Sequence, residues 1–230
     1  MSYSQRHTGA VYYALTGDVD VRGLEQEWAQ FLTADEARKL DKLVLPRDRR
    51  DYLCAHLLLR RALAAERGLD PKEVPPAERN GWSLTHTAGF VACAVAADPA
   101  AAVGVDAEHL TAAQRLAELT HVFMTAAENA ALPSDPNGRA ERMVEIWTAK
   151  EAVLKARGEG FSGEEGFRVL LMLESSDLGM LDGWATISVR DARTGAAYSA
   201  WRRWVGSHVV TFVAIEGNEG EPRLIGVSLQ

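Results

Sequence analysis

Two acidic residues stand one residue apart directly after an apolar run. Asp106 and Glu108 follow residues 101–105, whose sequence is AAVGV. If this run forms a strand, its alternate side chains share a face, so both carboxylates point the same way. Two like charges at the buried end of a strand repel each other and lose hydration unless a cation joins them, and paired carboxylate oxygens suit Mg²⁺. The alternative is a solvated strand end that runs into a loop.

A third carboxylate occurs in a helical pattern further along the chain. Glu151 comes one helical turn after Trp147 and four residues before Lys155. It borders an apolar face that includes Met143 and Leu154, so it is expected to be partly shielded from water. The alternative is an ordinary Glu–Lys pair on a helix surface, which contributes about 0.3–0.5 kcal/mol.

His86 stands between Thr85 and Thr87 at the end of a predicted strand. Its ring nitrogens could donate hydrogen bonds to a phosphate, although a histidine with a structural role fits the same pattern. The other histidines lack the spacing of zinc ligands. The sequence also lacks a Gly-x-Ser-x-Gly elbow, a Walker loop and a dinucleotide-binding glycine pattern.

The composition is that of an ordinary globular protein. Of the 230 residues, 47% are hydrophobic and 25% are charged, which suits one large domain or two domains of about 100–120 residues each. The formal net charge of -7 argues against broad nucleic-acid binding, which needs a basic surface. Residues 38–50 are nevertheless rich in Lys and Arg, and form either a local basic pocket or a solvated helix face.

The cysteines and the start of the chain indicate a cytoplasmic protein. Cys54 and Cys93 lie among apolar residues, so we expect buried free thiols, as in a reducing compartment. The first residues show no charged segment leading into an apolar one, so no signal peptide is expected. The longest apolar runs are far shorter than the roughly 20 residues of a membrane span.

The pattern of elements predicts two α+β halves with a boundary near residue 101. Thr33 is a candidate N-cap and Gly68 a candidate C-cap. In the first half, strands are expected at 10–15, 82–86 and 90–97, and helices at 24–32, 34–43 and 47–68. In the second half, strands are expected at 101–109, 169–173, 184–190, 197–205 and 208–215, and helices at 112–131 and 139–157.

A weak internal echo adds to this prediction of two similar halves. His86 is followed four residues later by Phe-Val-Ala, and His208 is followed by the same three residues at the same distance.

Read in order, the motifs resemble a known family. VGVDAE at 103–108 followed by WTAKEAVLK at 147–155 resembles the signature of the 4'-phosphopantetheinyl transferases, which is Gly-hydrophobic-Asp-x-Glu and then Trp-x-x-Lys-Glu-Ala-x-x-Lys. LTHT at 84–87 resembles the family's Ser-His segment, with Thr in place of Ser. LVLPRD at 43–48 and Arg60 resemble its basic segment and helix. The resemblance covers roughly residues 35–160, and the chain length fits the Sfp-type subgroup, a single-chain pseudo-dimer of two α+β halves.

The resemblance implies the reaction. Such an enzyme moves phosphopantetheine from coenzyme A to a serine of an apo acyl or peptidyl carrier protein, giving holo carrier and 3',5'-ADP. A serine hydroxyl attacks the β-phosphorus of a pyrophosphate, which requires charge neutralisation, removal of the serine proton and help for the leaving phosphate. The subgroup favours carriers of secondary metabolism, such as those of polyketide, nonribosomal-peptide and antibiotic synthesis, and a monomeric protein. Fatty-acid carriers remain possible substrates.

The resemblance also implies roles for particular residues. Asp106 and Glu108 would hold Mg²⁺, and Glu151 would be the third ligand, the general base or both. Lys155 would bind the α-phosphate side and stabilise the leaving group. The coenzyme A contacts implied by the motifs are Arg47, Arg50, Thr85, His86, Thr87, Lys150 and Lys155. The first half, 1–101, would supply coenzyme A phosphate contacts, and the second, 102–230, the magnesium and catalytic residues.

The sequence departs from the family pattern in two places. The loop before Trp82 reads PPAERNG where the family has Gly-Lys-Pro, so Arg79 is a substitute contact. The long helix carries Asp51-Tyr52 where members have Arg before an aromatic residue, so Arg50 is expected to serve instead.

Two other functions fit the same motifs. One is a non-catalytic protein that binds a carrier or coenzyme A on the same fold, and the other is a different Mg²⁺-dependent hydrolase that cleaves pyrophosphates. For a transferase, residues 121–124 (HVFM) are a candidate carrier-docking surface if they are exposed, and core residues if they are not.

Overall fold

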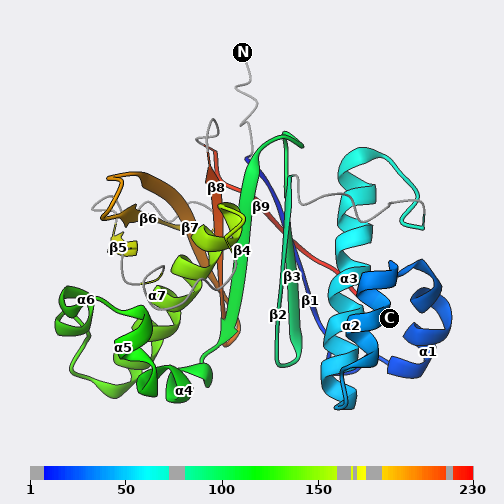
Figure 1. Cartoon of the computed structure of the whole chain (residues 1–230), viewed down its shortest axis with the longest axis horizontal. Coiled ribbons are helices and arrows are strands. Elements are labelled where there is room, and N and C mark those ends of the chain that lie inside the picture. Colours follow the sequence, from blue (N-terminus) through cyan, green and yellow to red (C-terminus); the bar gives the residue numbers. More distant parts are fainter. Residues whose placement is uncertain are drawn as a thin grey trace.

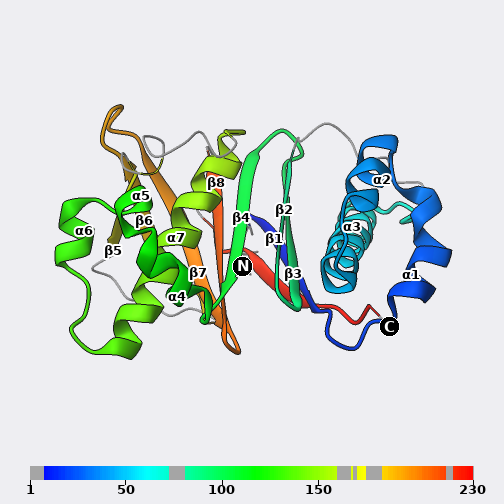
Figure 2. The ribbon, with the colours of Figure 1, turned by 60° about the horizontal axis from the view of Figure 1, so that its bottom comes forward.

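The computed structural model describes residues 8–72, 81–159, 167, 170–174, 183–215 and 220–229. Two sheets face each other, and helices cover the outer side of each sheet (Figures 1 and 2). The first sheet has the strand order β2-β3-β1-β9 and the second β4-β8-β7-β6-β5. The fold is therefore α+β, as predicted.

The elements follow the chain in this order. The first half contains β1 (Gly9–Leu15), α1 (Val21–Trp28), the 3-10 turn η1 (Ala29–Phe31), α2 (Ala34–Asp41), α3 (Pro46–Arg67), β2 (Trp82–Thr87) and β3 (Phe90–Ala96). The remainder contains β4 (Ala102–His109), α4 (Ala112–Glu118), α5 (Thr120–Phe123), α6 (Ala126–Ala130), α7 (Pro136–Ala156), β5 (Leu170–Glu174), β6 (Ala185–Asp191), β7 (Ala197–Val205), β8 (His208–Ile215) and β9 (Arg223–Gly226).

Helix α3 forms the core of the first half with the outer face of its sheet. The helix begins at Pro46, whose ring fits the first turn, and ends at Gly68, which adopts a φ of 67° that favours glycine. Its apolar side chains pack against alternate residues of β3, such as Val91 and Cys93. Cys93 and Cys54 are free and buried, as predicted.

Helix α7 lies very close to β4 because of one glycine. A Cβ atom on Gly104 would lie 1.9 Å from the carbonyl oxygen of Ala152 and 2.7 Å from the nitrogen of Ala156. Only a residue without a side chain fits between this strand and this helix. The contact fixes the helix turn that carries Glu151 and Lys155 against the strand that carries the predicted acidic pair.

A third core lies between the two sheets and belongs to both. Phe90 and Ala92 enter it from β3, while Val105, Val210 and Phe212 enter it from β4 and β8. These residues alternate in sequence with those that face the helices, as expected for strands buried on both faces.

The predicted helix over 112–131 is wrong, since three short helices occupy this stretch. Met124 is extended, with φ and ψ of -104° and 142°. Thr125 then begins α6 with a capping box in which Glu128 bonds back to the Thr125 nitrogen. The Thr125-x-x-Glu128 pattern was a visible signal for this break. Another such box, with Thr33 as N-cap, begins α2 as predicted.

The two halves share an order of elements. In each half, the first strand is followed along the chain by helices, one of which is long. In the sheets, the first strand of each half lies at one end of a similar row of three strands, β1-β3-β2 and β4-β8-β7. The echo in the sequence matches this order in part, because Phe90 and Phe212 lie on β3 and β8, but His86 lies on β2 and His208 on β8. Strand β9 was not predicted and returns to pair with β1 in parallel. The division near residue 101 and the pseudo-dimer stay predictions.

No helix in the described part of the chain is both long and apolar enough to cross a membrane.

Candidate functional site

The site lies where the edge strands β2 and β4 of the two sheets adjoin, beneath the last turns of α7. Asp106 is buried there, with 6% of its surface exposed. Its Oδ1 accepts hydrogen bonds from the Lys155 ammonium at 2.7 Å and from the Thr85 hydroxyl at 2.9 Å. Its Oδ2 is also buried, yet no donor among the described residues reaches it. A bare buried carboxylate oxygen is costly in a native structure and indicates a missing partner.

Lys155 is fixed by two acceptors on β4. Besides Asp106, its ammonium donates to the carbonyl of Val105 at 3.1 Å. This carbonyl lies on the edge of β4 that faces away from β8, and that edge pairs with no other strand in the described part of the fold. The lysine retains partial exposure, with 29% of its side chain open to solvent, so it can still meet a ligand.

Glu108 follows two residues later on the same face of β4. Its Oε2 accepts from the Thr87 hydroxyl at 3.1 Å, and its Oε1 accepts from the Arg115 guanidinium at 3.1 Å. Burial raises the pKa of Glu108, and the nearby charge of Asp106 adds to this effect, while Arg115 opposes it. The predicted arrangement of two carboxylates on one face is therefore confirmed.

Glu151 lies on α7, and its carboxyl group interacts electrostatically with Asp106 and Glu108. Burial and the charges of Asp106 and Glu108 together raise the pKa of Glu151 to about 7, against the opposing effect of Lys155. A carboxyl group with this pKa exchanges protons near neutral pH. The four residues on which the motif prediction rested thus interact in one place.

The residues present fit a divalent cation by their chemistry. Carboxylate oxygens are hard ligands, and a bound cation would satisfy the bare Oδ2 of Asp106 and relieve the mutual repulsion of the three acids. Among the described residues, no three acidic, histidine or cysteine side chains are gathered closely enough to enclose a metal. Binding therefore requires Glu108 or Glu151 to turn toward Oδ2, and the magnesium site stays a prediction.

Five of the seven predicted coenzyme A contacts lie on β2 and in the first turns of α3, and the other two lie on α7. His86 is exposed and lies on the face of β2 opposite to Thr85. Arg47 is largely exposed at the start of α3 and pairs loosely with Asp48 at 3.4 Å. Arg50 contacts Asp51 at 3.3 Å and donates to the carbonyl of Gly17 at 3.4 Å. The loop with Arg79 lies outside the described residues.

Asp51, the departure from the family pattern, has a structural role. It is buried and accepts hydrogen bonds from the Thr16 hydroxyl and from the Gly89 nitrogen, the latter at 3.2 Å. These bonds tie α3 to the end of β1 and to the turn between β2 and β3. The carboxylate thus positions the strand end that carries His86.

The structure speaks against the predicted coenzyme A contact of Lys150. Its side chain is fully buried, and its ammonium donates to Glu128 and to the carbonyl of Phe123, both at 2.7 Å. Burial lowers the pKa of Lys150, while Glu128 opposes this effect. Because α7 turns this residue inward and its neighbour Glu151 toward the site, Lys150 anchors α5 and α6 to α7.

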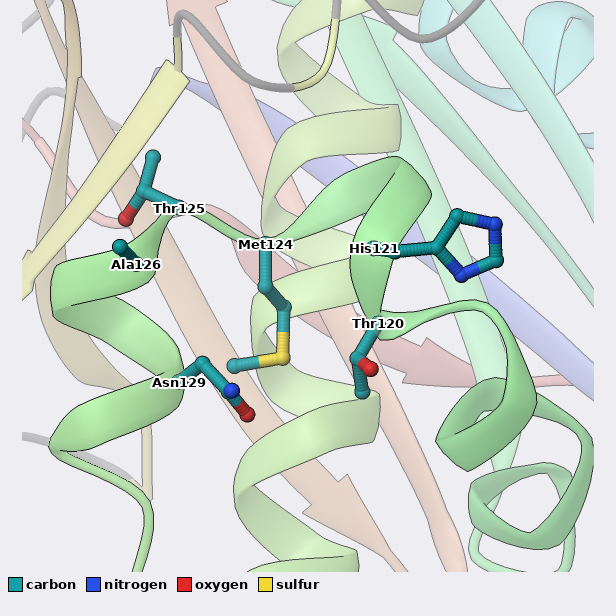
Figure 3. A pocket seen from close by; sticks show the side chains of 6 residues that line it. All are labelled: Thr120, His121, Met124, Thr125, Ala126 and Asn129. Carbon is teal, nitrogen blue, oxygen red and sulfur yellow. The ribbon is translucent and has the colours of Figure 1, made fainter.

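The candidate docking segment is mostly core. Phe123 is fully buried and meets the ring of Trp147 edge-on at 5.3 Å, and Met124 is 5% exposed. An exposed apolar patch of these residues is therefore not present. A pocket nevertheless opens beside them, and Figure 3 shows Met124 among its lining side chains. The lining residues are Thr120, His121, Met124, Thr125, Ala126 and Asn129.

Sequence reasoning missed three hydrogen-bond partners of the acidic pair, which are Arg115 and the hydroxyls of two threonines. Arg115 lies on a separate helix, and its spacing from Glu108 carries no recognisable signal. The hydroxyls of Thr85 and Thr87 did leave a signal, because their two-residue spacing equals that of Asp106 and Glu108.

Fold and site together define an α+β protein with three interacting carboxylates and a lysine where two sheets adjoin. A sequence model of the 4'-phosphopantetheinyl transferase superfamily matches residues 102–213. The chain is also similar to the 4'-phosphopantetheinyl transferase HetI of Nostoc sp. (strain PCC 7120), with 26% identity over 181 residues that cover 71% of this chain and 76% of HetI. Both matches support the 4'-phosphopantetheinyl transferase superfamily, which is the family and the enzyme class that the motifs predicted. The place of the chain in the Sfp-type subgroup stays a prediction.

Proposed function

We propose that the protein transfers the 4'-phosphopantetheine group of coenzyme A to a serine of an apo acyl or peptidyl carrier protein, in a reaction that depends on Mg²⁺. The observation that carries this proposal is the state of Asp106. One of its oxygens is held by Lys155 and Thr85, while the other is buried and meets no donor among the described residues. The charge of Asp106 also acts on Glu108 and Glu151. This arrangement supports a site that holds a cation against an anionic substrate.

The reaction requires one bond to form and one to break. The carrier serine oxygen attacks the phosphorus that carries pantetheine, and the bond from that phosphorus to the bridging oxygen breaks, so 3',5'-ADP leaves. Glu151, whose pKa is about 7, suits removal of the serine proton at neutral pH. A bound Mg²⁺ would neutralise charge on the pyrophosphate. Asp106 and Glu108 would hold it, and Glu151 serves as third ligand, as base or as both.

Lys155 is placed to help the leaving group. Its ammonium lies beside Asp106 and remains partly exposed, so a phosphate oxygen can share it. A positive charge at this point stabilises the negative charge that develops on the leaving phosphate. Arg47, Arg50 and His86 are proposed to bind the other phosphates of coenzyme A, in particular the 3'-phosphate.

The test is a direct transfer assay. The protein is incubated with Mg²⁺, coenzyme A and a panel of apo carriers from fatty-acid, polyketide and nonribosomal-peptide synthesis, and each carrier is weighed by mass spectrometry. A carrier should gain the mass of one phosphopantetheine, whereas a variant carrier with Ala in place of its serine should gain none, and chelation of Mg²⁺ should abolish the gain.

The other outcomes separate the competing functions. If no carrier in the panel gains mass, the transferase proposal fails. Binding of coenzyme A or carrier without turnover would indicate a non-catalytic protein. Release of phosphate products without a carrier would indicate a hydrolase.

A further inference from the structure

Three hydroxyl side chains alternate along β2 and point toward β4. Ser83, Thr85 and Thr87 are two residues apart, so they share one face of the strand. The two strands are edges of different sheets and are not paired with each other in the described part of the fold. The first hydroxyl instead accepts a hydrogen bond from the Val105 nitrogen at 3.0 Å. Side-chain hydrogen bonds thus join β2 to β4 at this junction in place of the backbone hydrogen bonds of a paired sheet.

The next two hydroxyls meet the acidic pair. Thr85 donates to Asp106 at 2.9 Å, and Thr87 donates to Glu108 at 3.1 Å. Thr85 and Asp106 are both buried, with 5% and 6% exposed. Hydrogen bonds to a charged acceptor in such a place are strong, and a β-branched side chain in a strand has restricted χ1 freedom. The two hydroxyls therefore hold the carboxylates in fixed orientations.

We propose that Thr85 and Thr87 are positioning residues that set the affinity of the acidic pair for a divalent cation. Thr85 joins Lys155 on one oxygen of Asp106, so the other oxygen is the one presented to a cation. Outer groups that orient metal ligands in this way commonly contribute 10–100-fold to metal affinity. The inference rests on the proposed function, because the cation belongs to it.

The geometry favours this role over direct contact with a coenzyme A phosphate. A threonine hydroxyl has one hydrogen to donate, and in both residues that hydrogen points at a carboxylate. A phosphate oxygen at neutral pH needs a donor as well. Contact with the phosphate would therefore require the bond to Asp106 or Glu108 to break.

The experiment measures binding of Mn²⁺ to the full-length protein without coenzyme A, by calorimetric titration. Thr85→Val keeps the shape of the side chain and removes the hydroxyl, and we expect it to weaken Mn²⁺ binding about 10-fold or more. Thr85→Ser keeps the hydroxyl and should bind like the unaltered protein. Thr87→Val should weaken binding less, because Arg115 still holds Glu108. Thr186→Val on β6, outside the junction, is the matched control.

The Mn²⁺ affinities of these variants decide whether Thr85 positions Asp106. Unchanged Mn²⁺ affinity in Thr85→Val, or equal loss in Thr85→Ser, overturns the positioning role. Circular dichroism checks that each variant folds, and Thr85→Ala replaces Thr85→Val if the latter does not. Absence of Mn²⁺ binding to the unaltered protein refutes this inference together with the metal site.

The transfer assay separates this inference from the proposed function. If carriers gain no mass but Thr85→Val weakens Mn²⁺ binding, only the proposed function fails. If transfer proceeds and Thr85→Val binds Mn²⁺ normally, only the positioning role fails.

Discussion

At the scale of single residues, the site depends on how each oxygen of Asp106 is used. Oδ1 is neutralised in part by Lys155 and Thr85, and Oδ2 is left buried without a donor among the described residues. Burial and the charges of the neighbouring acids raise the pKa of Glu151 to about 7. The protein without metal therefore carries an electrostatic cost that a cation would remove.

Loss of either acid should abolish most of the transfer activity. We expect Asp106→Ala and Glu151→Gln each to lower kcat/KM by about 100-fold or more, because each removes a group proposed to act with the metal. Steady-state kinetics with a fixed carrier measures the effect. Glu118→Gln, an exposed residue at the end of α4, should leave the rate unchanged. Near-normal activity in both site variants would refute the assigned site.

The raised pKa of Glu151 should appear in the stability of the metal-free protein. Its folded pKa of about 7 lies above the ordinary value of 4.5, so ionisation in the folded state is disfavoured and the carboxyl group becomes increasingly destabilising as pH rises from 4.5 through 7. Glu151→Gln should therefore have a Tm a few degrees higher at pH 8 in the presence of a chelator. The difference should narrow as the pH falls toward 5. Thermal scans at several pH values measure it, and an equal Tm at pH 8 would show that the pKa of Glu151 is not raised in the folded protein.

At the scale of elements, the site is formed by a strand and a helix in unusually close contact. Gly104 allows the backbone of α7 to touch β4 at Ala152 and Ala156, and the same turn of the helix carries Glu151 and Lys155 toward Asp106. Gly104 of the motif therefore helps to place α7 against Asp106 and Glu108, which follow two and four residues later on β4.

Gly104→Ala should disturb both folding and the site. The new methyl group would meet backbone atoms of Ala152 and Ala156, which cannot rotate away, so α7 must shift at a cost of roughly 2–3 kcal/mol. Urea unfolding should show this loss, and transfer activity should fall even where the variant is folded. Gly17→Ala is the control, since nothing lies within 4 Å of its added methyl. Equal stability of the two variants would contradict the close packing.

Most elements could be predicted because their signals are local. The caps of α2 and α3 are formed by Thr33 and Gly68, as the sequence indicates. The break at Met124 was missed because helix-forming residues on both sides outweighed the Thr125 capping box. Strand β9 was missed because its short sequence gains stability only from pairing with β1, more than two hundred residues away in the chain. The shared direction of Asp106 and Glu108 could be predicted because side chains alternate along one strand. The burial of Lys150 could not be predicted because it depends on tertiary packing against Glu128.

At the scale of the whole molecule, the two halves share a core and a site. The core between the sheets contains Phe90 from the first half and Phe212 from the second. His208 of β8 stacks on Phe90 with ring centroids 4.5 Å apart. Strand β9 also carries the end of the chain back into the first sheet. Neither half can bury its inner sheet face alone.

The protein should therefore unfold as one cooperative unit. Unfolding in urea followed by tryptophan fluorescence and by far-ultraviolet circular dichroism should give coincident transitions. Phe212→Ala, which opens the shared core, should lower stability by roughly 3–5 kcal/mol and move both transitions together. The exposed Val44, changed to Ala, should leave the midpoint unchanged.

Fragments 1–101 and 102–230 should each fail to show a cooperative transition when expressed alone, because each would expose an apolar sheet face. Two separate transitions in the full chain, or a stable isolated fragment, would show that the halves are independent domains and that the site forms only when they dock.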